Sequence, residues 1–129
     1  MNKRPLQIVT ALTGTVPVIT GIVQMMGVHD PLYASLHLPA DATLDSNMRF
    51  LAGVWLGLGL ASWWLAPRIA QETVLFRFLW LMIFLGGVGR LVSMASVGLP
   101  LTPFIGFTAL EVLGAPLFIY WQHRVAQNS

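Results

Sequence analysis

Four stretches of this chain are long enough and apolar enough to cross a lipid bilayer as helices. They cover residues 6–28, 47–66, 74–97 and 103–121. A spanning helix needs about 20 mostly apolar residues, and its backbone groups must bond to one another because hydrocarbon contains no water. The sequence therefore predicts an all-α integral membrane protein, with a single four-span domain over residues 1–129 folded as an antiparallel four-helix bundle.

Composition supports this class and excludes several others. Only 9% of the residues are charged and 56% are hydrophobic, whereas soluble domains carry about 25% charged residues. The chain has no cysteine, which excludes disulfides, a thiol nucleophile and a cysteine metal site. Its basic residues are scattered rather than clustered, so we expect no nucleic-acid partner.

The positions of lysine and arginine predict the orientation of the helices. The outer links, residues 29–46 and the short link near Gly98, contain aspartates but no lysine or arginine. Because basic residues favour the cytoplasmic side of a membrane, an even number of spans places both termini in the cytoplasm. The basic residues of that side are Lys3, Arg4, Arg68, Arg77 and Arg124. We expect an aromatic belt on the same side, formed by Trp63, Trp64, Trp80, Tyr120 and Trp121.

Helix-capping residues predict the ends of the helices. Asp45 or Ser46 suits the start of the second helix, and Gly98 suits the end of the third. Thr102 followed by Pro103 is typical of the start of a fourth helix. In the outer loop, Asp30 and the proline after it predict a short helix that continues to residue 36.

Two charged residues lie deep inside apolar stretches. Arg90 precedes the end of the third stretch by seven residues, and Glu111 follows Pro103 by eight, which places them roughly 10 and 12 Å below the outer ends of their helices. An ionised side chain in hydrocarbon is costly, so it usually faces the protein interior and finds a partner. The two charges are therefore expected to pair in the outer half of the bilayer.

A third charge, Arg49, lies one turn inside the second helix, and Asp45 precedes it by four residues. The spacing predicts an ion pair between them. Gly53 and Gly57 follow on the face of Arg49, and we expect them to form a tight helix contact beneath it. We therefore predict a buried polar cluster of Arg49, Arg90 and Glu111, with Asp45, Asn47 and Ser93 nearby.

Three interpretations of this cluster stay open. It forms a ligand site for a lipid, a quinone or another small amphipathic or anionic molecule, or it is a structural clamp within a subunit that docks on itself or on a partner membrane protein. The third interpretation, proton or ion conduction, has little support because the only buried carboxylate is Glu111. We expect membrane lipids as partners in every case.

No sequence motif points to catalysis or to a cofactor. Phosphate-binding, hydrolase and zinc-protease motifs are absent, and His29 and His37 match no ligand spacing despite the aspartates around them. We therefore expect no metal, no cofactor and no catalytic residue. Pro17 and the threonines near it predict a kinked, hydroxyl-rich first helix, which either packs against a neighbour or lines a cavity.

Three segments resemble the DoxX-like superfamily of small four-helix membrane proteins, most closely a bacterial branch of unknown function. They are the string LDSNMRFLAG over residues 44–53, the string GRLVS over residues 89–93, and Glu111. The resemblance covers essentially the whole chain and implies a four-helix bundle in the bacterial inner membrane. Relatives have been connected with quinone-linked oxidation, with sterol or lipid ligands and with chaperoning of membrane proteins, but none of these roles transfers to individual residues here.

Overall fold

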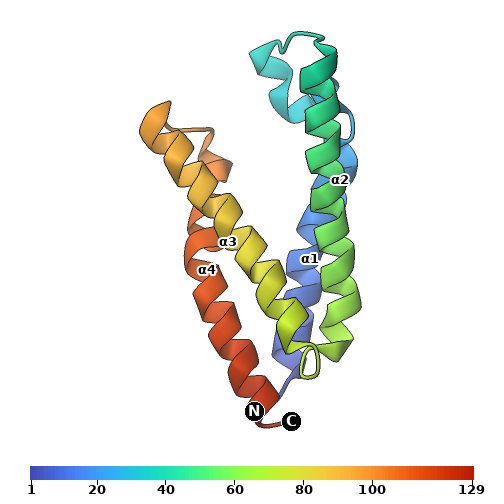
Figure 1. Cartoon of the computed structure of the whole chain (residues 1–129), viewed down its shortest axis with the longest axis vertical. Coiled ribbons are helices and arrows are strands. Elements are labelled where there is room, and N and C mark those ends of the chain that lie inside the picture. The colour runs from blue at the N-terminus through green and yellow to red at the C-terminus, as the bar shows by residue number, and fades with distance from the viewer. The chain divides into compact units, whose positions relative to one another are not determined.

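The computed structural model describes residues 1–129 and is helical throughout, without strands (Figure 1). Four helices are long enough and apolar enough to cross a membrane, which confirms the four predicted apolar helices by length and composition. They are α1 (Arg4–Gln24), α2 (Ala42–Leu65), α3 (Thr73–Ser96) and α4 (Thr102–Gln127). Three short 3₁₀ helices lie between them: η1 (Gly27–His29), η2 (Pro31–Leu36) and η3 (Ala66–Arg68).

Two helix starts differ from their predictions. Helix α2 begins at Ala42 and is capped by Asp41, whose carboxylate accepts a hydrogen bond of 2.9 Å from the backbone N–H of Leu44. Asp45 and Ser46 are therefore not its cap, because the helix starts one turn earlier. Helix α4 begins at Thr102 itself, with Leu101 in the capping position.

Helix α4 also continues to Gln127 instead of ending at Trp121, because no proline or glycine interrupts its polar last turn. The short outer helix is confirmed as η2. The carboxylate of Asp30 accepts from the backbone N–H of Leu32 at 3.0 Å, and the helix ends at Leu36.

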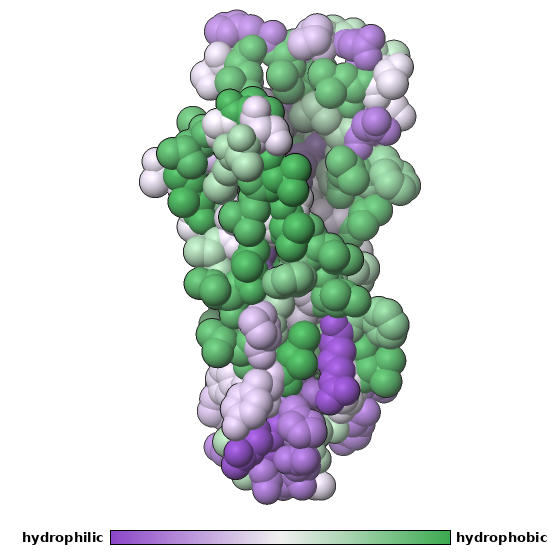
Figure 2. Space-filling model, turned by 60° about the vertical axis from the view of Figure 1, so that its left-hand side comes forward, coloured by the Kyte–Doolittle hydropathy of each residue, from purple (hydrophilic) through white to green (hydrophobic).

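The outer surfaces of the helices are strongly hydrophobic. Leucines such as Leu85, Leu113 and Leu117 expose about three-fifths of their surface. Figure 2 shows a face that is mostly hydrophobic, with hydrophilic residues gathered near its two ends. An apolar surface of this extent is costly in water and favourable in hydrocarbon, which indicates a membrane protein.

The chain divides into two compact units, Gln7–Pro67 and Met1–Leu6 with Arg68–Ser129. In the first unit α1 and α2 run in opposite directions and meet through glycines. A Cβ atom added to Gly14 would come within 2.7 Å of the Cβ of Ser62, and one added to Gly21 within 2.9 Å of Leu56. Glycine is required at these positions because the two backbones approach closely.

Gly53 and Gly57 do not form the close contact between α1 and α2. A Cβ atom on Gly57 would meet nothing within 4 Å, and one on Gly53 only the end of Met25 at 3.7 Å. The residue of α2 that packs closely on α1 is Gly59, which lies on a different side of the helix. The Gly-xxx-Gly pattern therefore did not identify the face of α2 that packs on α1.

Hydroxyls of α1 hold α2 through its tryptophans. The indole N–H of Trp55 donates to Thr20 at 2.8 Å, and that of Trp63 donates to Thr15 at 3.1 Å. Each threonine hydroxyl also donates to a backbone carbonyl one turn earlier in α1. Of the two roles that the sequence left open, the structure gives these hydroxyls a packing role.

In the second unit α3 and α4 also run in opposite directions. Trp80 of α3 stacks on Phe118 of α4 with ring centroids 4.5 Å apart, and Thr73 contacts Gln122 near the end of α4. Trp80 is only 7% exposed, so its predicted place in a surface belt is wrong. Gly114 of α4 lies against its ring, and a Cβ atom added to Gly114 would lie 3.6 Å from Trp80, at ordinary contact distance.

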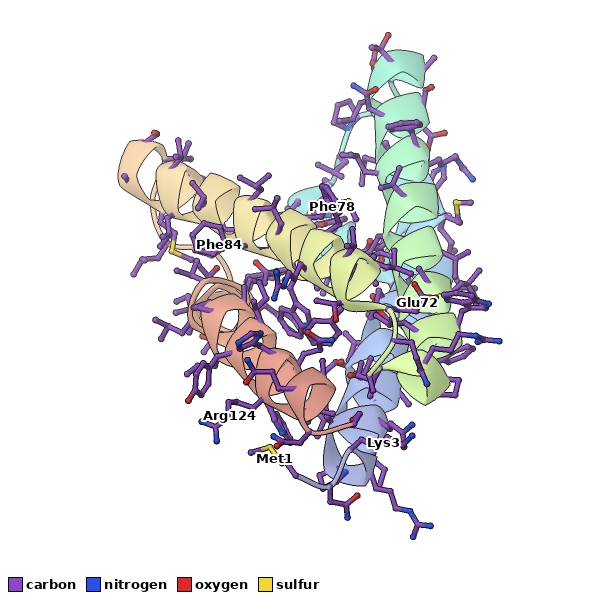
Figure 3. All side chains as sticks on the ribbon, turned by 60° about the horizontal axis from the view of Figure 1, so that its bottom comes forward. Met1, Lys3, Glu72, Phe78, Phe84 and Arg124 are labelled. Atoms are coloured by element: carbon purple, nitrogen blue, oxygen red, sulfur yellow. The ribbon has the colours of Figure 1, made fainter.

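Both chain ends lie together in this unit (Figure 1), and Lys3 and Arg124 lie at the same end as Met1 (Figure 3). Beside them is the most deeply buried part of the unit, formed by the fully buried side chains Leu6, Ile69, Phe76, Gln122 and Val125. Gln122 was not singled out from the sequence. Its amide nitrogen donates to the carbonyl of Ile69 at 3.0 Å and to the hydroxyl of Thr73 at 2.9 Å. It therefore ties the link before α3 to the end of α4.

Replacing Gln122 with alanine should destabilise the protein. The change leaves the Ile69 carbonyl without its donor in a fully buried place, which costs about 1–3 kcal/mol. Thermal unfolding of the purified protein in detergent, followed by tryptophan fluorescence, should show a lower melting temperature. Gln71→Ala is the control because Gln71 is exposed. Equal melting temperatures for the two variants would contradict a tying role for Gln122.

Candidate functional site

Arg90 of α3 and Glu111 of α4 form an ion pair, as their predicted depths suggested. The Nε atom of Arg90 lies 3.0 Å from Oε2 and 3.3 Å from Oε1 of Glu111. The Glu111 side chain is 10% exposed, whereas that of Arg90 is 38% exposed. The carboxylate is thus buried while part of the guanidinium stays open.

Close approach of the two helices brings this pair together. Gly87 lies one turn before Arg90, and a Cβ atom there would come within 2.9 Å of the Cβ of Glu111 and 2.8 Å of Val112. The buried residues of α4 around this contact include Thr108, Glu111, Gly114 and Ala115. Small residues on both helices therefore allow a short Arg90 contact across the interface.

Phe104 is a further member of the site that the sequence reasoning missed. Its ring centroid lies 5.3 Å from Cζ of Arg90, a cation–π contact. Phe104 precedes Glu111 by seven residues, or two helical turns, so helical spacing was the signal that could have found it. Phe107 lies beside Phe104 with ring centroids 6.2 Å apart and extends the aromatic surface.

The terminal nitrogens of Arg90 are unused. Within the unit of α3 and α4 only Nε donates, and neither Nη1 nor Nη2 has an acceptor there. Four N–H donors are thus available beside an aromatic surface, and such donors strongly prefer an acceptor when water is scarce. Chemically, the site is a fixed cation with one open edge, which is formed by Nη1 and Nη2 of Arg90.

Arg49 lies in the other unit and has a different environment. Its Nε atom bonds Asp45 at 2.7 Å, which confirms the predicted pair. Its Nη1 and Nη2 atoms donate to the carbonyls of Met25 and Met26, which follow the last residue of α1. The other oxygen of Asp45 accepts from the backbone N–H of Val28 at 3.0 Å. The pair therefore bonds to backbone groups just beyond the end of α1, where carbonyls lack helical partners.

The remaining predicted site residues make fewer contacts. Asn47 and Ser93 are exposed, and neither side chain has a hydrogen-bond partner in the structure. Arg49 and Asp45 belong to one unit, and Arg90, Glu111 and Ser93 to the other. Their assembly into one ligand-binding cluster stays a prediction. No three His, Asp or Glu side chains come together in a way that could hold a metal ion.

Gly27 should be intolerant of substitution because it lies under the Arg49–Asp45 pair. Its φ angle is +61°, and an added Cβ atom would lie 2.0 Å from Oδ1 of Asp45. Gly27→Ala should therefore cost about 1–3 kcal/mol or more of stability. Gly57→Ala, with nothing within 4 Å, should be neutral or stabilise by up to about 1 kcal/mol. Melting temperatures in detergent test both variants. A Gly27→Ala protein as stable as the natural protein would contradict the close contact between Gly27 and the Arg49–Asp45 pair.

Comparison with known protein families matches residues 5–122 to the family described as "Domain of unknown function (DUF4345)", and the chain belongs to that family. No curated protein matches the chain. No solved structure matches it either. The family has no assigned function, and a relationship to the DoxX-like superfamily stays a prediction from the quoted residues.

Proposed function

We propose that this DUF4345 member binds a lipid, a quinone or another small amphipathic molecule, with the polar head of that molecule at Arg90. In this proposal the four helices form one antiparallel bundle in the bacterial inner membrane, with both termini in the cytoplasm. The Arg90–Glu111 pair then lies in the outer half of the bilayer. Support for the orientation comes from the distribution of lysine and arginine along the sequence.

The open edge of Arg90 is the observation that carries the proposal. A purely structural clamp would engage the whole guanidinium, as Asp45 and two carbonyls do for Arg49. Arg90 instead gives Glu111 only its Nε atom. Donors left free inside hydrocarbon are unfavourable, so a bound polar group stabilises the site.

The surroundings of Arg90 suit the apolar part of such a molecule. Phe107 is 39% exposed and continues the aromatic surface from Phe104. A hydrocarbon tail can pack against these side chains through van der Waals contacts, which are what drive association inside a bilayer. Ser93, one turn beyond Arg90, has a free hydroxyl that can contact the same head group.

A second candidate function is that of a structural or accessory subunit, and open glycines favour it. Cβ atoms added to Gly86 and Gly89 of α3, or to Gly106 of α4, would meet nothing within 4 Å. Small residues on an exposed helix face let another helix approach closely. In this function the chain docks on a second copy or on a partner membrane protein, and the Arg90–Glu111 pair is a clamp.

Native mass spectrometry of protein released gently from detergent distinguishes the two functions. The binding proposal predicts a retained lipid or quinone that is lost in Arg90→Leu, because its head group then has no donors. Arg77→Leu removes an exposed arginine of the same helix and should retain the molecule. A stable oligomer with a clean protein mass would contradict the binding proposal and support the subunit function.

A further inference from the structure

We infer that the ligand of Arg90 carries an oxyanion, a phosphate or carboxylate group, as the head group of an anionic lipid. The inference rests on the proposed function and names the ligand class of that site. It follows from the way in which the guanidinium is held and from the number and arrangement of its free donors.

The protein fixes the guanidinium and leaves one edge for the ligand. Glu111 accepts a hydrogen bond from Nε, and the centroid of the Phe104 ring lies 5.3 Å from Cζ, against one face of the guanidinium. The edge that remains contains Nη1 and Nη2, whose parallel N–H groups match two oxygens on one phosphorus or carbon atom. An oxyanion can therefore bind in the bidentate manner that arginine favours.

The bond from Arg90 to Glu111 is longer than the bond from Arg49 to Asp45. The two Nε–carboxylate distances of 3.0 and 3.3 Å exceed the 2.7 Å of the Arg49–Asp45 bond in the same protein. Charge-assisted bonds of this kind are usually about 2.7–2.9 Å long. An oxyanion on the Nη edge would contact the cation directly and lie further from Glu111, so attraction exceeds repulsion.

A neutral head group fits the same edge less well. A quinone oxygen or an ester carbonyl offers a single uncharged acceptor atom, whereas the edge presents two parallel donors. An unmatched donor in an apolar environment is unfavourable. The site should therefore distinguish an anionic lipid from a neutral molecule with the same hydrocarbon chains.

Two lipids with identical chains test this inference. Delipidated full-length protein in detergent is titrated with dioleoylphosphatidylglycerol or with dioleoylglycerol, which lacks the phosphate, and binding is followed by native mass spectrometry. We expect the phosphatidylglycerol to bind at least about tenfold more tightly, as a hydrogen-bonded charge requires. Decylubiquinone, a neutral quinone, should resemble dioleoylglycerol.

Arg90→Lys tests whether the guanidinium edge carries this preference. Lysine keeps the positive charge but lacks the two-nitrogen edge. Binding of phosphatidylglycerol should weaken about tenfold, while binding of dioleoylglycerol should not change. Arg77→Lys is the matched control and should bind phosphatidylglycerol like the natural protein. Should Arg90→Lys fail to fold, the ratio of the two lipids on the natural protein still decides the ligand class.

Three outcomes would overturn the inference, and they are distinguishable. If dioleoylglycerol or decylubiquinone binds as tightly as phosphatidylglycerol and depends on Arg90, the ligand class is wrong but the proposed binding function stands. If no probe depends on Arg90, both fail. If millimolar inorganic phosphate displaces phosphatidylglycerol, and this displacement depends on Arg90, the site binds a free oxyanion and not a lipid.

Discussion

The ion pair between Arg90 and Glu111 is the interaction that most constrains how α3 and α4 pack. A buried carboxylate without a cation is strongly unfavourable, so Glu111 requires Arg90 within bonding distance. That distance requires α3 and α4 to approach closely, which Gly87 permits because any side chain there would collide with Glu111 and Val112. The inward positions of Thr108, Gly114 and Ala115 follow from the same approach. The requirement of one ion pair thus determines which faces of these two helices meet.

Arg49 and Arg90 are held in different ways. Arg49 donates from all three nitrogens to protein acceptors and holds the end of α1 to the start of α2. Arg90 donates from one nitrogen and presents the rest. Free donors are costly in hydrocarbon, so in the membrane placement that we propose this contrast favours the binding of a head group at Arg90.

Properties that depend on neighbours along the chain were predictable from the sequence. The lengths of the apolar runs predicted four helices, the Asp30–Pro31 pair predicted η2, and the four-residue spacing of Asp45 and Arg49 predicted their bond. The depths of Arg90 and Glu111 predicted their pairing, because a short link makes α3 and α4 adjacent.

Properties that depend on distant partners were not predictable. Several polar residues could cap α2, and only the structure shows that Asp45 is engaged by Val28 and Arg49 while Asp41 is the cap. The choice of Gly59 over Gly57 as the contact with α1 depends on a rotation of one helix that a periodic pattern does not define. The bonds of Gln122 to the link before α3 likewise join residues about fifty positions apart.

An experimental structure of the protein in phosphatidylglycerol nanodiscs tests the central claim most directly. The account predicts a head group within hydrogen-bonding distance of Nη1 and Nη2 of Arg90, with Nε still bound to Glu111 and the ring of Phe104 still against the guanidinium. A guanidinium edge closed entirely by protein groups, with no space for a head group, would contradict the account and leave the ion pair as a structural clamp.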